Sequence, residues 1–416
     1  MKIASIMGCE NNWQLRWFSV LCSGGIFTLI YYWIKEIPDT AMKFFAFSVA
    51  CLNLFALDYF VMARGYVSGM FFEILALGLF VNSIKNKNFN SGRVALFCAG
   101  LSAIANFNFF YFFVCFSGVY FFISYFKNGK SFLKNKLFYF DVLMALGFAL
   151  LVLRALLFIK RCSNDFGLGY DEFVPALFSS FIDGITYKNI GMANNTLNNW
   201  SMVLAVLVFV SAAYGILKFS VHKNRLYFFA SIIYLLMILL LVFNHTVFNL
   251  PYPYYRSLLS LAPLMVILII SIVQYVIPAN LPGKVSVTAV SIILAVNFFT
   301  NADLTFTFDF YHQHDAKPAF DLVQKLGGKR VGMCHEHFGV YINYYQPSDK
   351  YKYPFSGVQL NTYDDSKDWI EKNKLDDFDY LILYPPYELK YYKKRKISFT
   401  GVNVFPVSGT VVLKVN

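Results

Sequence analysis

Residues 226–243 have the sequence LYFFASIIYLLMILLLVF and contain no charged side chain. As an α-helix, a stretch of this length extends about 27 Å, close to the roughly 30 Å hydrocarbon core of a bilayer. The segment is therefore predicted to span a membrane, and this decides the fold class.

Further apolar stretches of similar length lie on both sides of this segment. They fall at residues 15–34, 42–60, 66–84, 137–159, 200–218, 256–277 and 285–301. A longer run from Val94 to Phe126 is interrupted by Asn106 and Asn108, which predicts two short helices. Residues 1–302 are therefore predicted to form an α-helical polytopic membrane bundle of about ten hydrophobic segments.

The overall composition agrees with a membrane protein. Of the 416 residues, 57% are hydrophobic and only 14% are charged, whereas about a quarter are charged in soluble proteins. Four of the seven cysteines lie inside apolar stretches, so no disulfide framework is predicted. Lys2 precedes the first apolar segment but no small-residue cleavage site follows it, and we expect that segment to stay in the membrane.

The formal net charge is +12, and the cations cluster in short connections between apolar stretches. The clusters consist of Lys85, Lys87 and Arg93; Lys127, Lys130, Lys134 and Lys136; and Lys218, Lys223 and Arg225. Lys and Arg concentrate in cytoplasmic loops, so these connections are predicted to face the cytoplasm. Because orientation accounts for the charge, we expect no nucleic-acid partner.

Successive segments cross the membrane in opposite directions, so the charge pattern also predicts which connections lie outside the cytoplasm. The connection near Arg64, the loops 160–199 and 244–255, and everything after residue 302 fall outside the cytoplasm. From residue 303 polarity rises, and helical and extended patterns alternate. Helices are expected at 316–326, after Phe338 and at 364–373, and strands at 330–334, 378–383, 402–407 and 410–415. Residues 303–416 are thus predicted to be a small extracytoplasmic α/β domain.

Charged groups at membrane depth are costly and point to function. Asp58 and Arg64 lie at the outer ends of two neighbouring segments. Arg64 could clamp a phosphate bidentately, or it could reach the lipid headgroups with Asp58 as its ion-pair partner. Pro251-Tyr252-Pro253-Tyr254-Tyr255-Arg256 brings a second cation to the same side. Its tyrosines also suit an interfacial aromatic belt.

Two further groups of polar residues were considered. Glu73 lies inside an apolar segment, where an unpaired carboxyl is expected to be protonated or to hydrogen-bond the helix that carries Asn106. The pairs His312/His314 and His335/His337, with Cys334, contain competent zinc ligands. The second half of a zinc motif is absent, so no metal site is predicted.

Asn12–Leu21 (NWQLRWFSVL), followed two helices later by Ala63-Arg64-Gly65-Tyr66, resembles bacterial members of the GT-C class of membrane glycosyltransferases. These are polyprenyl-phosphate-sugar-dependent enzymes related to protein O-mannosyltransferases and the lipid A aminoarabinose transferase. Gly100-Leu101-Ser102 with Asn106, and Pro253 with Arg256 and Pro263, also fit the pattern. The resemblance covers most of residues 10–278, through short motifs.

In that class the catalytic carboxylate lies in a first external loop, after a first membrane helix, and both precede a segment like Asn12–Trp33. The resemblance thus implies that the chain lacks this helix and loop, which agrees with residues 1–14 also falling outside by alternation. Glu10 and Asp58 are the candidates for a general base. The expected substrate-binding residues are Arg64, Tyr66, Asn106, Tyr252, Tyr255 and Arg256.

The resemblance implies a glycosyltransferase that moves a sugar from a polyprenyl-phosphate donor to a glycan, lipid or protein acceptor on the outer face of the cytoplasmic membrane. No cofactor is expected. A lipid-linked glycan transporter or flippase would also need cations facing a cavity, but no catalytic acid. A noncatalytic membrane component of envelope assembly would instead bind a partner through its external domain.

Overall fold

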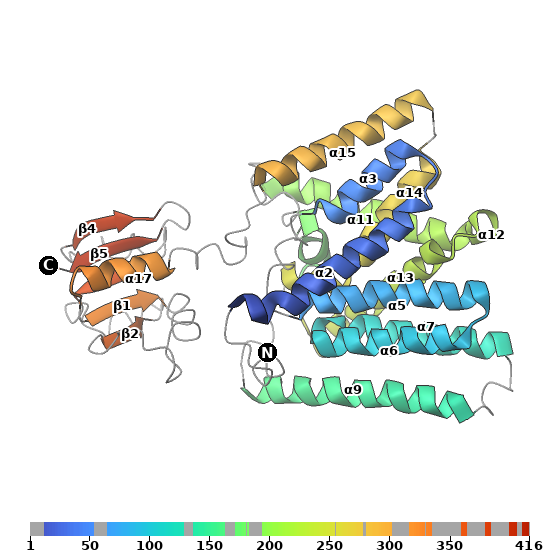
Figure 1. The fold of residues 1–416 in the computed structure, drawn as a ribbon, viewed down its shortest axis with the longest axis horizontal. Helices are drawn as coiled ribbons and strands as arrows, with labels where there is room; N and C mark the ends of the chain where they lie inside the picture. Colours follow the sequence, from blue (N-terminus) through green and yellow to red (C-terminus); the bar gives the residue numbers. More distant parts are fainter. Residues whose placement is uncertain are drawn as a thin grey trace. The chain divides into compact units, whose positions relative to one another are not determined.

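A computed structural model describes residues 12–53, 65–128, 136–162, 171–179, 181–182, 194–253, 255–277, 280–301, 316–328, 330–334, 359–363, 379–383, 399–405 and 410–415. The chain forms two units, Met1–Ala302 and Asp303–Asn416. The division falls where polarity rises in the sequence. The described part of the first unit is helical, whereas the second contains a sheet (Figure 1).

Seven helices within the described residues are long and apolar enough to cross a membrane. They are α2 (Asn12–Lys35), α5 (Tyr66–Asn86), α7 (Phe110–Asn128) with the preceding 3-10 turn η1 (Phe107–Phe109), α9 (Lys136–Cys162), α11 (Asn194–Leu217), α13 (Arg225–Phe248) and α15 (Leu281–Asn301). Three apolar helices are shorter: α3 (Thr40–Cys51), α6 (Phe89–Ala105) and α14 (Ala262–Val276). Every predicted segment thus contains a helix, but within the described residues only seven helices reach crossing length.

The predicted interruption near Asn106 is present in the structure. Helix α6 ends at Ala105, and α7 begins at Phe110 after η1. The Asn106 side chain accepts a hydrogen bond from the Asn108 backbone N–H at 3.0 Å, which satisfies a donor at the start of η1. The two asparagines therefore mark a real break between two helices.

The predicted segment 256–277 requires a correction. It begins with a separate 3-10 helix, η3 (Tyr255–Ser260), and α14 starts only at Ala262, with Pro263 in its first turn. Proline is tolerated there because first-turn N–H groups have no partner within the helix. Hydropathy averaged over the segment does not detect this change, because the apolar residues of α14 dominate the average.

The helical unit is built around α5. Helix α6 packs along it, α7 and α9 pack on α6, and α2 packs on another part of α5 (Figure 1). One buried cluster joins α5, α6, α7, α11, α13 and α14, and a second joins α2, α3, α5, α14 and α15. At Gly65, a Cβ would overlap the carbonyl of Ala105, so only glycine permits this approach of α5 to α6.

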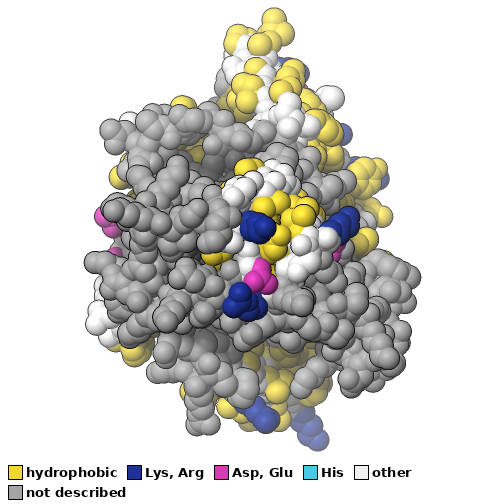
Figure 2. Space-filling view, turned by 90° about the vertical axis from the view of Figure 1, so that its left-hand side faces the viewer, with side chains coloured by type: hydrophobic (Ala, Val, Ile, Leu, Met, Phe, Trp, Pro, Cys, Tyr) yellow, Lys and Arg dark blue, Asp and Glu magenta, His cyan; other side chains and the backbone are white. Residues whose placement is uncertain are grey.

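The outer surfaces of the helices are also apolar. Helix α9 exposes Leu143, Leu146 and Leu150, and α15 exposes Ile293 and Phe299. Figure 2 shows hydrophobic side chains, in yellow, on part of the described surface. Apolar side chains exposed along helices of spanning length are expected where lipid replaces water. The protein is thus a multi-pass membrane protein by length and composition of its helices.

The connections at one end of the helical unit carry most of the described cations. The turn after α2 meets the start of α15 through an ion pair between Asp39 and Lys284 at 2.8 Å. His222 of the short α12 (Phe219–His222) stacks on Tyr275 of α14, with ring centroids 4.1 Å apart. Further Lys and Arg residues of this basic end are Lys35, Lys85, Lys87, Arg93, Lys136, Lys218, Lys223 and Arg225.

The opposite end is formed by the start of α5, by η1 and η3, and by the π-helical turn η2 (Pro175–Ser179). Asn244 of α13 donates a hydrogen bond to the Tyr111 hydroxyl at 3.1 Å, which ties the end of α13 to the start of α7. Turn η3 contacts η1, η2 and α5. The helices thus alternate in direction, as the charge pattern predicts.

The second unit contains a five-stranded sheet in the order β2-β1-β3-β5-β4. Its strands are β1 (Arg330–Cys334), β2 (Gln359–Tyr363), β3 (Tyr380–Leu383), β4 (Phe399–Val404) and β5 (Val411–Val415). β1 pairs in parallel with β2 and β3, whereas β5 is antiparallel to β3 and β4. Helix α17 (Ala316–Lys325) contacts β3 and β5, and buries Ala319 and Val323.

The sequence predicted α17 and four of these strands within a few residues, but it missed β2. That strand, QLNTY, has too few apolar residues to give a clear period-2 pattern. The helices expected after Phe338 and at 364–373 lie outside the described residues.

Candidate functional site

The structure describes some of the predicted site residues and not others. Glu10, Asp58 and Arg64 lie outside the described residues. Tyr255 and Arg256 lie in η3, and their side chains fall outside the described part. Tyr66, Asn106 and Tyr252 can be placed fully, as described below.

Tyr66 and Asn106 are neighbours at the opposite end. Tyr66 is the first residue of α5 and is buried, with 8% of its surface exposed. The preceding Gly65 lies against the Ala105 carbonyl, one residue before Asn106. Two predicted residues 40 positions apart are therefore brought together by the close crossing of α5 and α6.

The segment that carries Arg256 contacts the segments that carry Tyr66 and Asn106. Turn η3 contacts both η1 and α5. Phe109 of η1 and Leu259 of η3 are fully buried in one apolar cluster with Tyr66. The predicted segments 65–66, 106–109 and 255–260 thus meet at one end of the bundle, which we name the convergence site.

Tyr252 lies inside the protein and not in an exposed aromatic belt. It is 7% exposed. Its ring stacks on His245 of α13 at 4.3 Å between centroids and meets Phe173 edge-on at 5.2 Å. Phe173 comes from the long loop 160–199, so Tyr252 fixes that loop against the end of α13.

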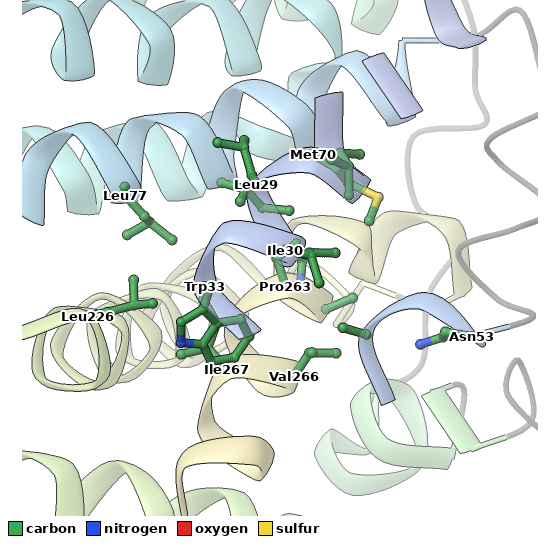
Figure 3. Close-up of a pocket in the computed structure, with 15 residues that line it drawn as sticks. Leu29, Ile30, Trp33, Asn53, Met70, Leu77, Leu226, Pro263, Val266 and Ile267 are labelled. Carbon is green, nitrogen blue, oxygen red and sulfur yellow. The ribbon is translucent and has the colours of Figure 1, made fainter. Parts of the chain in front are cut away.

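An apolar cavity of about 120 Å³ lies inside the helical unit. Met70 and Leu77 of α5 form one wall, and Pro263 and Ile267 of α14 form another (Figure 3). Trp33 of α2 lies toward the basic end, and Asn53, after α3, lies at the other end of the cavity. The cavity therefore runs along the helices that begin beside Tyr66 and after Arg256.

Glu73 departs from one expectation of the sequence analysis. Its side chain is fully buried, and neither carboxylate oxygen has a hydrogen-bond partner among the described residues. The expected hydrogen bond from Glu73 to the helix that carries Asn106 is therefore not formed among the described residues. Asn106 itself caps η1 and lies beside the start of α5. Glu73 is seven residues further along α5, about 10 Å deeper in the bundle.

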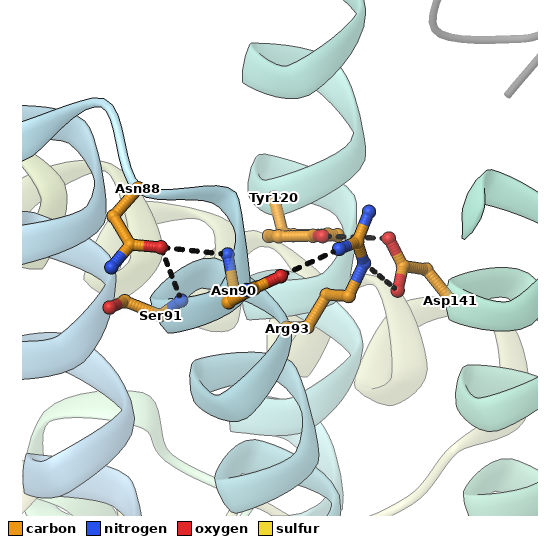
Figure 4. Close-up of polar contacts among 6 residues, drawn as sticks. All are labelled: Asn88, Asn90, Ser91, Arg93, Tyr120 and Asp141. Atoms are coloured by element: carbon orange, nitrogen blue, oxygen red, sulfur yellow. Dashed lines mark hydrogen bonds and ion pairs between the residues drawn. The ribbon is translucent and has the colours of Figure 1, made fainter.

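A second buried acid was missed in the sequence. Asp141 of α9 has no exposed surface and forms an ion pair with Arg93 of α6 at 3.1 Å (Figure 4). The Tyr120 hydroxyl donates a hydrogen bond to its other carboxylate oxygen at 2.9 Å. Arg93 also donates to Asn90 at 3.1 Å. The signal was available, because Asp141 is the one acid within an otherwise apolar stretch after a basic loop.

The zinc-competent residues cannot be assembled into a site. His312, His314, His335 and His337 lie outside the described residues. Elsewhere in the described chain, no three His, Cys, Asp or Glu side chains come together in a way that could hold a metal ion.

The chain has no detected relatives. It matches no known protein family, no curated protein and no solved structure. The geometry of the helical unit and the chemistry of its residues therefore carry the functional interpretation.

Proposed function

We propose that the protein is a membrane glycosyltransferase that moves a sugar from a polyprenyl-phosphate donor to an acceptor at the outer face of the cytoplasmic membrane. One observation supports this most directly. The segments bearing Tyr66, Asn106 and Arg256 meet at one end of the bundle, and α5 and α14, which begin at or just after two of these segments, line an apolar cavity.

This arrangement suits a donor with a polar head and a long hydrocarbon tail. The cavity walls are almost entirely apolar and run along the helix direction, as an isoprenoid chain requires. A guanidinium at the convergence site would hold the phosphate. The basic end carries the positive charge typical of cytoplasmic loops, so the convergence site would face the outer compartment.

The proposed roles follow from the chemistry of the transfer. When the bond between the sugar carbon and the phosphate oxygen breaks, negative charge grows on the phosphate, and Arg256, with Arg64, stabilises it. A carboxylate takes the proton of the acceptor hydroxyl as the new glycosidic bond forms. Asp58 and Glu10 remain the candidates in this chain.

The test is sugar transfer from a radiolabelled polyprenyl-phosphate sugar by the full chain in proteoliposomes. Arg256→Ala is expected to lower kcat about 100-fold or more, because a donor to the developing charge is lost. Arg256→Lys keeps the charge without the bidentate geometry and should lose less. Arg154→Ala is the matched control, since Arg154 is an exposed arginine of α9. Full transfer by Arg256→Ala would exclude this mechanism.

Glu73 gives a second candidate function some support. A buried carboxyl without a hydrogen-bond partner among the described residues is typical of proton-coupled membrane transport. A flippase for a lipid-linked glycan would use the same cavity. It would move a fluorescent lipid-linked sugar across the bilayer without breaking the bond to the phosphate, and Glu73→Gln would stop that movement while leaving any transfer intact.

A further inference from the structure

A second cavity, of about 380 Å³, lies at the basic end between α5, α6 and α7. It is separate from the convergence site, and no residue of the proposed transferase mechanism lines it. Its apolar wall consists of Phe80 and Ile84 of α5, Phe89 of α6 and Ile123 of α7. The cavity thus sits among the last turns of two spanning helices, Tyr66–Asn86 and Phe107–Phe126, at the depth of a membrane interface.

The polar wall of this cavity contains a cation and an amide. Ser83, Lys87, Asn88, Tyr120 and Ser124 line it. The hydroxyl protons of Ser83 and Tyr120 already go to the Phe80 carbonyl and to Asp141, whereas the Lys87 ammonium and the Asn88 amide can donate to an anion. Lys87 is the one charged side chain among the described residues that line the cavity.

The nearby negative charge is already compensated. Asp141 is held by Arg93 at 3.1 Å and by the Tyr120 hydroxyl at 2.9 Å. The acid therefore does not neutralise Lys87, and the electrostatic field in the cavity favours an anion. The first turn of α6 contributes little by itself, because Asn88 already accepts hydrogen bonds from the Asn90 and Ser91 N–H groups.

Two backbone features hold the cavity open. Lys87 ends α5 in the left-handed conformation, with φ 53°, and its N–H bonds the Ser83 carbonyl. This turn places the lysine at the rim between α5 and α6. At Gly92 a Cβ would lie 3.3 Å from the Tyr120 ring and 3.4 Å from the Ser83 hydroxyl, so a side chain there would fill the cavity.

We propose that this cavity binds the phosphate headgroup of an anionic membrane lipid. The cation and the donors of the polar wall match the phosphate, and the apolar wall matches the first carbons of the acyl chains. A free phosphate ion could also bind the cation and the donors, but it has no acyl chain to contact the apolar wall. The site is independent of the proposed transferase activity.

The experiment measures lipid binding by the full chain in nanodiscs. Phosphatidylcholine nanodiscs with increasing phosphatidylglycerol are compared by counting retained lipids in native mass spectrometry. Lys87→Gln is expected to weaken retention of phosphatidylglycerol about fivefold. Gly92→Leu should abolish retention without changing the charge, and a thermal unfolding curve shows whether each variant is folded.

Lys223 provides a matched control. It lies at the same basic end, also in the left-handed conformation with φ 53°, and it does not line this cavity. Lys223→Gln should leave retention within twofold of the parent. Equal losses in Lys87→Gln and Lys223→Gln would overturn the proposal, because they would reflect surface charge alone. Displacement of the lipid by millimolar inorganic phosphate would overturn the assignment to a lipid.

Discussion

Asp141 and Glu73 are both carboxylates without exposed surface in the helical unit, yet their surroundings are opposite. Asp141 lies near the basic end and is bound by Arg93 and Tyr120. Glu73 lies in the middle of α5, and its oxygens have no hydrogen-bond partner among the described residues. Close to the interface, a cation from a basic loop can reach a buried acid. At mid-membrane depth it cannot, so the cost of Glu73 persists and points to a use in function.

The largest expected effect comes from Asp141→Asn. Removing one partner of a buried ion pair leaves the other charge uncompensated, which costs about 3–5 kcal/mol. Because Arg93 is 18% exposed, the loss should fall near the lower bound of that range. Unfolding in mixed detergent micelles measures it, with the exposed Asp171→Asn as the control.

The double variant Arg93→Met/Asp141→Leu tests whether the uncompensated charge is the cause of the lost stability. Replacing both charges by apolar side chains removes the uncompensated group, so most of the lost stability should return. A double variant as unstable as Asp141→Asn would show that the pair is not the source of the effect.

Tyr120→Phe should have a smaller effect in the same direction. It deletes the hydrogen bond at 2.9 Å to the Asp141 carboxylate but leaves the ion pair with Arg93. Hydrogen bonds to charged groups contribute about 1.5–3 kcal/mol, and the same unfolding assay detects a loss of that size. No change in stability would mean that Arg93 alone compensates the acid.

Glu73→Leu should act in the opposite direction. An apolar side chain of similar size removes a buried polar group that has no partner, and the free energy of unfolding should rise by about 1–3 kcal/mol. Sugar transfer and lipid movement are measured on the same sample, because a gain in stability with a loss of activity would identify a functional carboxyl. A loss of stability like that of Asp141→Asn would contradict the contrast between the two acids.

The smallest effect is expected at Asp39, an acid near the solvent. The hydrogen bond from Lys284, with a second from the Met42 N–H, lowers the pKa of Asp39. Its contribution is therefore present above the unfolded pKa of about 3.9 and is lost as the pH falls through the lower folded value. The melting temperatures of the parent and Asp39→Asn should differ at pH 7 and converge near pH 3. Glu36→Gln, at the same turn, is the control for the loss of one negative charge.

Much of the helical unit could be predicted because hydropathy is a local property. An 18-residue run such as 226–243 must avoid water whatever its neighbours are, and a pair of asparagines can end a helix by capping alone. The same approach failed at Tyr255–Ser260, because hydropathy averaged over 256–277 is dominated by α14 and does not show that a separate 3-10 turn precedes it. It also missed β2, which depends on pairing with β1 more than on its own residues.

The candidate site was predicted only in part. The residue types at 66, 106 and 256 indicated polar groups on one side of a membrane, and the structure brings their segments together through Gly65 and η3. The cavity beneath them could not be predicted, since its walls come from helices far apart in the chain.

By itself, the sequence determined that this is a multi-pass membrane protein with its cations gathered in alternate connections. Hydropathy and charge belong to each residue, so they can be summed along the chain without knowledge of the fold. Only the tertiary structure decided that Asp141 is compensated and Glu73 is not, and that one cavity runs between α5 and α14 while another lies at the basic end. Those outcomes depend on which helix faces are in contact, and an ion pair across 48 residues, such as Arg93 with Asp141, exists only once α6 and α9 are packed.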